Sequence, residues 1–196
     1  MTLLAFDDLA AQIRTGPARA GATQVVAIDG PGGSGKSTLA ARLASLLDAP
    51  VVHMDDIYPG WNGLAAAAPL LREWVLEPLA RGQPVRFQRY DWSLDSYRNW
   101  VEVPAAEVLF VEGCGSGSRI VARFLTMLLW VEAPREVRFA RGIERDGAAY
   151  RPLWQRWARQ EDVLFAEERT RERADYVIDA AGTASYDWTR HVVIAD

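Results

Sequence analysis

One stretch decides the fold of this chain: Gly30-Pro31-Gly32-Gly33-Ser34-Gly35-Lys36-Ser37. It matches the pattern G-x-x-x-x-G-K-[ST], the Walker A phosphate-binding loop. An apolar, β-branched run at 24–29 precedes the loop and predicts a buried parallel strand. Leucines at helical spacing follow over 38–47 and predict a helix. A strand, a glycine-rich loop and a helix in this order predict a phosphate-binding site.

The loop residues have the chemistry that a nucleotide requires. Glycines let the backbone turn tightly and aim its N–H groups at phosphate oxygens, and the helix N-terminus adds the positive end of its dipole. Lys36, the only lysine of the chain, supplies a mobile charge for the β- and γ-phosphates, and Ser37 offers a hydroxyl to Mg²⁺. We therefore expect ATP and Mg²⁺ as cofactors. The expected nucleotide-binding residues are Gly30, Gly32, Gly33, Ser34, Gly35, Lys36, Ser37 and Thr38.

Length and composition limit the class of protein. The 196 residues are expected to form one domain, residues 1–196, and their 49% apolar content is that of a soluble globular protein. A net charge of −4 argues against a general nucleic-acid-binding protein. Cys114 is the only cysteine, which excludes an internal disulfide and fits a reducing compartment. Without a signal-peptide pattern or a membrane-length apolar run, we expect a cytoplasmic protein with a small-molecule acceptor and neither nucleic acid nor membrane as partner. Formation of a homo-oligomer stays open.

Further apolar runs predict the other elements of an α/β domain. The expected core strands are 51–54, 107–113, 127–132 and 174–179, with an edge strand within 186–194. The expected helices are 3–14, 119–125 and 153–173, with an apolar helical stretch at 64–80 that Pro69 and Pro78 break. Residues of about 85–103 predict a hairpin that leaves the main sheet, with its turn at 91–97.

Carboxylates follow two of the predicted strands. Asp55 and Asp56 come after the strand 51–54, and Glu112 ends the strand 107–113 in a Walker B-like arrangement. Ligands in open α/β sheets bind at the carboxyl ends of strands, so these acids are candidates for metal or base chemistry. The expected metal-binding residues are Ser37, Asp55 and Glu112. Turn capping by the Asp pair is the simpler alternative.

Three arginines lie on one face of the helix predicted after Pro134. Arg138, Arg141 and Arg145 are three and four residues apart. They indicate a lid at about 138–150 whose arginines close on phosphate groups, with a solvated cationic face as the alternative.

The order of these motifs resembles that of uridine kinase-like P-loop kinases over roughly residues 24 to 180. The resemblance rests on Val26-Ala27-Ile28-Asp29-Gly30, Asp55-Asp56-Ile57-Tyr58, Tyr90-Asp91-Trp92, Val111-Glu112-Gly113 and Arg138-x-x-Arg141-x-x-x-Arg145-Asp146. It implies a three-layer fold in which helices cover both faces of a five-stranded parallel sheet of order 2-3-1-4-5. It also implies transfer of the γ-phosphoryl group of ATP to a hydroxyl of a small acceptor, here a nucleoside.

The resemblance also implies roles for individual residues. Asp55 would accept the proton of the acceptor hydroxyl, with Lys36, Arg141 and Arg145 as the other catalytic residues. The expected acceptor-binding residues are Asp55, Asp56, Tyr58, Tyr90, Asp91, Trp92 and Arg98. Which of Asp55 and Asp56 is the base stays open.

The chain departs from the family pattern around the acceptor. Ile57 replaces the usual aromatic residue, and the histidine that often follows Tyr90-Asp91-Trp92 is missing. A nucleoside monophosphate, a sugar or a vitamin precursor is therefore an alternative acceptor. A monophosphate would need basic groups, for which Arg86, Arg89 and Arg98 are available.

Other classes and residues have simpler interpretations. A regulatory GTPase would need an Asn-Lys-x-Asp motif, which a chain with its only lysine in the phosphate loop cannot contain. An ATP-binding regulator or ATPase stays an alternative. Trp61 and Trp92 either stack on a base or belong to the core. Cys114 is expected to be inert, and His53 and His191, without partners at ligand spacing, to be structural.

Overall fold

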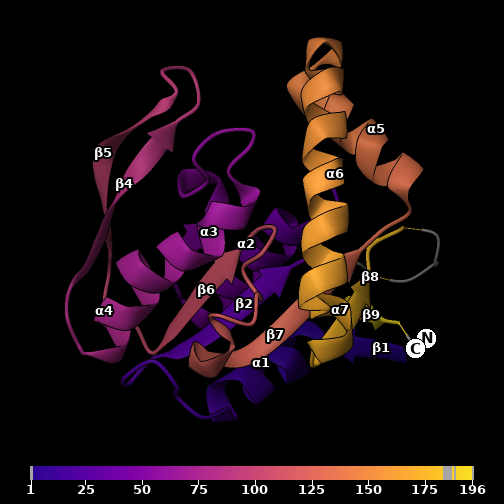
Figure 1. The fold of residues 1–196 in the computed structure, drawn as a ribbon. Coiled ribbons are helices and arrows are strands. Elements are labelled where there is room, and N and C mark those ends of the chain that lie inside the picture. The colour runs from indigo at the N-terminus through magenta and orange to yellow at the C-terminus, as the bar shows by residue number, and fades with distance from the viewer. Residues whose placement is uncertain (1, 183–186, 188, 196) are drawn as a thin grey trace.

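A central sheet of seven strands organises the fold, which was analysed as a computed structural model that describes residues 2–182, 187 and 189–195. The strand order is β1-β9-β8-β7-β2-β6-β3 (Figure 1). The bounds are β1 (Thr2–Ala5), β2 (Gln24–Asp29), β3 (Val51–His53), β6 (Val108–Glu112), β7 (Leu125–Glu132), β8 (Tyr176–Asp179) and β9 (His191–Ile194).

The sequence prediction of a five-stranded, wholly parallel sheet is wrong in the number of strands and in the full order. The five predicted strands are neighbours in the relative order expected, because β3, β6, β2, β7 and β8 pair in parallel. Two strands extend the sheet beyond β8: β9 pairs with β8 and with β1, both times antiparallel. The strand expected within 186–194 therefore lies inside the sheet, and Tyr186 lies outside the described residues.

Alternating side chains of β2 supply the two sides of the core. Val25 and Ala27 pack in one apolar cluster, and Val26 and Ile28 pack in the other, as the period of two in a strand requires. Helices α1 (Phe6–Thr15) and α2 (Lys36–Leu47) cover the second cluster, and α3 (Leu64–Leu71), α4 (Glu77–Ala80) and α6 (Arg151–Glu168) cover the first. The sheet is thus a middle layer between helices (Figure 1).

Several helix predictions need correction. The helix expected at 3–14 begins at Phe6, because the preceding residues pair with β9 as β1. The stretch 64–80 is not broken, since Pro69 lies inside α3, a π-helical turn (Arg72–Leu76) follows, and α4 starts beside Pro78. The helix expected at 119–125 is only a 3-10 turn (Ala122–Phe124) that leads into β7.

The segment expected as one helix at 153–173 is divided. It forms α6 and α7 (Thr170–Arg173), and Arg169, with φ +50°, separates them in the left-handed region. The preceding helix α5 (Arg135–Asp146) carries the three lid arginines and leads into α6 through a 3-10 turn (Ala148–Tyr150).

The predicted hairpin is confirmed. Strands β4 (Val85–Asp91) and β5 (Ser96–Val103) form a separate antiparallel sheet of two strands. The hairpin lies on the opposite side of the molecule from α5 (Figure 1). Its turn brings Trp92 to the end of β3, where the side chain donates to the backbone oxygen of Asp55 at 2.9 Å.

Candidate active site

The phosphate loop joins β2 to α2 at the carboxyl edge of the parallel strands. Gly30, Gly33 and Gly35 have φ values of +137°, +75° and +103°, which side chains other than glycine rarely adopt. A Cβ at Gly30 would lie 2.2 Å from the Val131 oxygen, and one at Gly33 would lie 2.3 Å from the Arg138 oxygen. The glycines therefore serve both the left-handed backbone and the close approach of neighbouring elements.

Asp29 ties the start of this loop to the loop after β6. Its carboxylate is fully buried and accepts the N–H groups of Gly30, Gly115 and Gly117 at 2.7, 2.8 and 2.9 Å. Burial raises the pKa of Asp29 to about 6, although the three N–H donors oppose this shift.

Lys36 begins α2 and is buried. Its ammonium group donates to the backbone oxygen of Pro31 at 2.9 Å, within the loop. Burial by itself acts to lower the pKa of Lys36, but nearby negative groups, among them Glu161, Glu112 and Asp29, raise the pKa overall. The side chain therefore stays charged, as a phosphate ligand must.

Glu112 links α2 to the neighbouring strands β6 and β3. The buried carboxylate at the end of β6 accepts the Ser37 hydroxyl at 3.2 Å. The same oxygen lies 2.7 Å from Nδ1 of His53, at the end of β3. His53 was predicted to be structural because no partner stands at ligand spacing in the sequence. The structure gives it a partner from the neighbouring strand, because β3 and β6 pair with His53 opposite Glu112.

The two neighbouring aspartates have different surroundings. Asp55 lies in a 3-10 turn (Met54–Asp56) after β3 and opens onto the pocket beside the loop. Desolvation raises the pKa of Asp55 and Glu112 raises it further, while Lys36 and Arg145 act in the opposite direction. Asp56 instead forms an ion pair with Arg89 at 3.0 Å and does not line the pocket.

A pocket of about 730 Å³ joins the loop to the acids and the lid. The predicted residues that line it are Gly32, Gly33, Gly35, Lys36, Ser37, Thr38, Asp55, Tyr58, Trp92, Glu112, Arg141 and Arg145. Gly30, Ser34, Asp56, Tyr90, Asp91 and Arg98 do not line it. Residues from the phosphate loop, α2, the turn after β3, the end of β6, the hairpin turn, α5 and α6 thus meet at one cavity.

The hairpin residues outside the pocket have local partners. The Tyr90 hydroxyl donates to Asp95, and the Asp91 carboxylate caps the turn by accepting the N–H of Ser93 at 2.9 Å. Arg98 donates to the Ser96 hydroxyl at 3.1 Å. The structure therefore places Tyr90, Asp91 and Arg98 in the hairpin's own framework.

An aromatic wall, formed by Tyr58, Trp61, Trp92, Tyr150 and Trp157, lines the part of the pocket next to Asp55. The ring of Trp61 lies 5.3 Å from Trp92, 6.2 Å from Tyr150 and 6.1 Å from Trp157, measured between centroids. The sequence prediction included Tyr58 and Trp92 and left Trp61 undecided, but missed Tyr150 and Trp157. No local pattern indicates them, because the 3-10 turn before α6 and α6 itself bring them from a distant part of the chain.

The lid arginines all have partners. Arg141 donates to the Ala180 oxygen at 2.9 Å, and Arg145 pairs with both oxygens of Asp146 at 2.7 and 3.0 Å. Arg138 faces the phosphate loop and donates to the Gly32 oxygen at 3.1 Å. A wholly solvated cationic face does not describe this helix, since the Arg138 side chain is only 17% exposed.

Cys114 is buried at the back of the pocket. Its Sγ lies 3.3 Å from the Gly30 oxygen and 3.1 Å from a Glu161 oxygen, and burial raises its pKa well above the ordinary value. A protonated thiol is a weak nucleophile, in accord with the expectation that Cys114 is inert.

The donor set suits Mg²⁺ bound together with a nucleotide. Among the described residues no group of three or more His, Cys, Asp or Glu could hold a metal unaided. Mg²⁺ ordinarily takes one or two carboxylates, waters and phosphate oxygens, and Ser37 beside Glu112 provides such a partial site.

Comparisons with known proteins agree with this architecture. No protein-family model and no curated protein matches the chain. A structure of a possible uridine kinase from Bacillus stearothermophilus aligns over 88% of this chain and 96% of its own, with 22% identity and a TM-score of 0.65. A candidate fructose transport system kinase from Silicibacter sp. TM1040 aligns over 89% and 95%, with 25% identity and a TM-score of 0.56. The fold is that of the uridine kinase-like P-loop kinases, as the motif resemblance implied.

None of the helices in the described residues is both long and apolar enough to cross a bilayer.

Proposed function

We propose that this protein is an ATP-dependent small-molecule kinase that transfers the γ-phosphoryl group to a hydroxyl of an uncharged acceptor with a planar face, most simply a nucleoside. One observation carries the proposal: the phosphate loop, Asp55 and the aromatic wall open onto a single pocket. The fold shared with uridine kinase-like proteins supports the same class of reaction.

The loop side of the pocket would hold the nucleotide. The loop amides and Lys36 would bind the phosphates, and Ser37 and Glu112, with Asp55, would hold Mg²⁺. Bound Mg²⁺ supplies charge neutralisation at the phosphate oxygens.

Asp55 would act on the acceptor. It lines the same pocket as the phosphate loop and the aromatic wall, where it can orient a hydroxyl and accept its proton. Its raised pKa favours this role, because a base is most effective when its pKa approaches the working pH. Arg141 and Arg145 would leave their present partners to stabilise the transferring charge.

The three arginines that could have bound a phosphate group on the acceptor lie outside the pocket, which favours an acceptor without such a group. Arg86 lies over the Trp100 ring at 4.2 Å, Arg89 pairs with Asp56, and Arg98 donates to Ser96. None of these three lines the pocket. Aromatic rings instead form the acceptor side, and they suit a planar or apolar face. A nucleoside monophosphate is therefore the weaker candidate.

The test is a phosphorylation assay with Mg²⁺-ATP and a panel of nucleosides, monophosphates, sugars and vitamin precursors, followed by product mass and ADP release. We expect a phosphorylated nucleoside, no product with Lys36→Ala, and a loss of at least 100-fold in kcat with Asp55→Asn. Asp56→Asn is the matched control, since its side chain lies outside the pocket. Phosphorylation of another acceptor would keep the reaction and reject the nucleoside.

Hydrolysis of ATP without any phosphorylated acceptor would instead favour an ATPase. Binding of ATP with neither reaction would favour a nucleotide-binding regulator.

A further inference from the structure

Glu161 is a buried acid placed directly behind the phosphate loop. The residue comes from α6, its relative exposure is 3%, and one carboxylate oxygen accepts the Gly32 N–H at 2.6 Å. A buried carboxylate costs free energy unless it is paired or hydrogen-bonded. A negative charge beside a polyphosphate site also repels the ligand, so Glu161 is expected to have a structural role in the loop. Glu161 lies outside the lining of the large pocket, so it supports the loop from behind rather than occupying the phosphate position.

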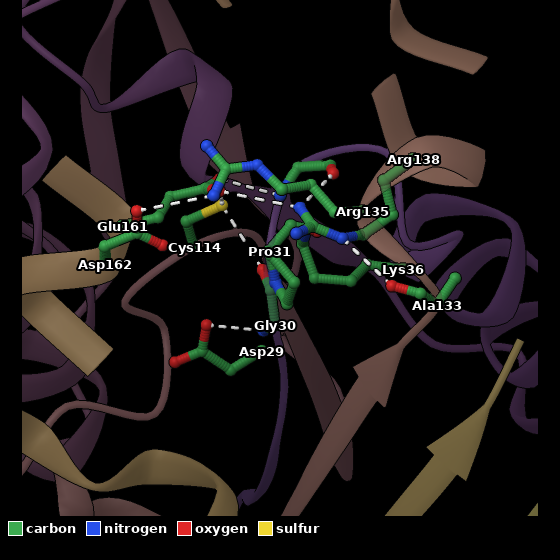
Figure 2. A network of polar contacts seen from close by, with 11 residues as sticks. Asp29, Gly30, Pro31, Lys36, Cys114, Ala133, Arg135, Arg138, Glu161 and Asp162 are labelled. Carbon is green, nitrogen blue, oxygen red and sulfur yellow. Dashed lines mark hydrogen bonds and ion pairs between the residues drawn. The ribbon is translucent and has the colours of Figure 1, made fainter. Parts of the chain in front are cut away.

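A second side chain reaches the same loop residue from the neighbouring helix α5, which carries the lid arginines. Arg138 of α5 donates to the Gly32 oxygen at 3.1 Å and to the Ala133 oxygen at 3.1 Å. Its guanidinium also lies 3.8 Å from the second oxygen of Glu161. Figure 2 shows Arg138, Glu161, Cys114 and Lys36 converging around the loop. Both the N–H and the C=O of Gly32 are therefore held from outside the loop.

The arrangement leaves little room for a side chain at Gly32. A Cβ at Gly32 would lie 3.1 Å from the Glu161 oxygen and 3.1 Å from the Trp154 ring, tighter than ordinary contacts. On the lid itself, a Cβ at Gly142 would lie 2.2 Å from Trp154, so α5 and α6 pack closely together. The two helices thus reach the loop as one packed unit.

A loop this rich in glycine has many conformations to lose when it binds a nucleotide. Ordering such a backbone on binding weakens affinity, whereas contacts that order it beforehand remove this penalty. The contacts to Gly32 are of this kind, and one of them is charge-assisted, which makes it stronger than a neutral hydrogen bond.

We propose that Glu161 is a positioning residue that fixes the Gly32 peptide from behind, with Arg138 as its counterpart, so that the loop is set for phosphates before a nucleotide arrives. The inference rests on the proposed function in taking a nucleotide as the ligand. Since α5 and α6 each hold one side of the same residue, a movement of this helix pair away from the sheet breaks both contacts. Loop order and lid position are therefore coupled.

The experiment compares Glu161→Ala, Glu161→Gln and wild type in two measurements. The first is hydrogen exchange of the Gly32 amide by NMR in the nucleotide-free protein. The second is binding of Mg²⁺-ATP by calorimetry. Glu167→Gln is the matched control, because Glu167 is an exposed acid on the same helix.

We expect the Gly32 amide to exchange at least tenfold faster in Glu161→Ala and ATP to bind at least tenfold more weakly. Glu161→Gln should show a smaller effect than Glu161→Ala in both measurements, because its amide oxygen still accepts the Gly32 N–H, although through a weaker, neutral hydrogen bond. If Glu161→Ala does not fold, Arg138→Ala removes the second contact and should weaken ATP binding at least threefold.

Equal ATP affinity in a folded Glu161→Ala protein, or an equal loss in the Glu167→Gln control, would overturn the inference. Failure of the wild type to bind ATP is a different result, which rejects the proposed function. The exchange of the Gly32 amide then still decides whether Glu161 holds the loop.

Discussion

Nδ1 of His53 lies 2.7 Å from Oε1 of Glu112, the same oxygen that accepts the Ser37 hydroxyl. This hydrogen bond raises the pKa of His53 above its ordinary value, so the folded protein holds the imidazole proton more tightly than the unfolded chain does. The resulting stabilisation is fully present below the unfolded pKa of about 6.5 and is lost as the pH rises through the folded pKa.

We therefore expect His53→Ala to lower the free energy of unfolding more at pH 5.5 than at pH 9. The difference should be below about 1 kcal/mol, because the side chain is 48% exposed and solvent screens the pair. Urea unfolding at the two pH values measures it, with His191→Ala as the control. An equal effect of His53→Ala at both values would show that the pair does not stabilise the fold.

Substitution of Asp29 should disturb the edge of the sheet that carries the phosphate loop. Asp29→Asn retains one oxygen but turns an N–H₂ group toward one of the backbone N–H donors, which leaves a buried donor unpaired. We expect a loss of about 2–4 kcal/mol in the free energy of unfolding. The measurement is urea unfolding, with the exposed Asp162→Asn as control, for which a change below about 0.5 kcal/mol is expected.

Arg145 is the lid arginine whose charge interacts with that of Asp55. The hydrogen bond to Asp146 is the main cause that raises the pKa of Arg145. The charges of Asp55 and Glu112 raise this pKa further. We expect Arg145→Ala to lower kcat about 100-fold, with a smaller change in the KM of the acceptor, since the group acts on transferring charge. Steady-state kinetics with the acceptor found above provide the measurement.

Arg135→Ala is the control for this prediction. Arg135 belongs to the same helix, but it is 64% exposed and its partner is the exposed Asp162 at 3.8 Å. An unchanged kcat in Arg145→Ala would remove Arg145 from the proposed mechanism.

Trp61 should determine how well the acceptor binds. Its ring packs against Trp92 and Trp157 in the wall of the pocket, so Trp61→Ala removes one face of the expected acceptor site. We expect the KM of the acceptor to rise about 5- to 50-fold with the KM of ATP unchanged, and Trp61→Phe to restore most of the loss.

The control is Trp100→Ala, on the hairpin away from the pocket, where the side chain is 58% exposed. A rise in the KM of ATP alone would place Trp61 on the nucleotide side instead.

The phosphate loop and the parallel strands could be predicted because their signals are local. The loop pattern, the apolar run at 24–29 and the run ending at Glu112 each need only neighbouring residues to be interpreted. The strand β1 was missed for the opposite reason: Leu3 and Leu4 fit a helical pattern, and only pairing with the distant β9 makes this segment a strand.

The candidate site was predicted only where its residues have local sequence signals. Asp55 and Glu112 lie at or just after strand ends and could be found, but Tyr150 and Trp157 reach the pocket only because α6 and the turn before it pack over the site. The tryptophans of α6 have the spacing of ordinary core contacts. Glu161 gave no signal, because a single acid in an amphipathic helix is normally solvent-exposed.

The only lysine of the chain is also the ammonium group held at the Pro31 oxygen inside the phosphate loop. A protease that cleaves after lysine therefore has one target bond in this sequence, at the start of α2. Cleavage there requires the loop to leave its site, so the rate of this single cut reports directly how often the loop opens. Amine-acylating reagents likewise meet only one ε-amine in this sequence, so labelling at Lys36 can be followed without a fluorophore or a mutation.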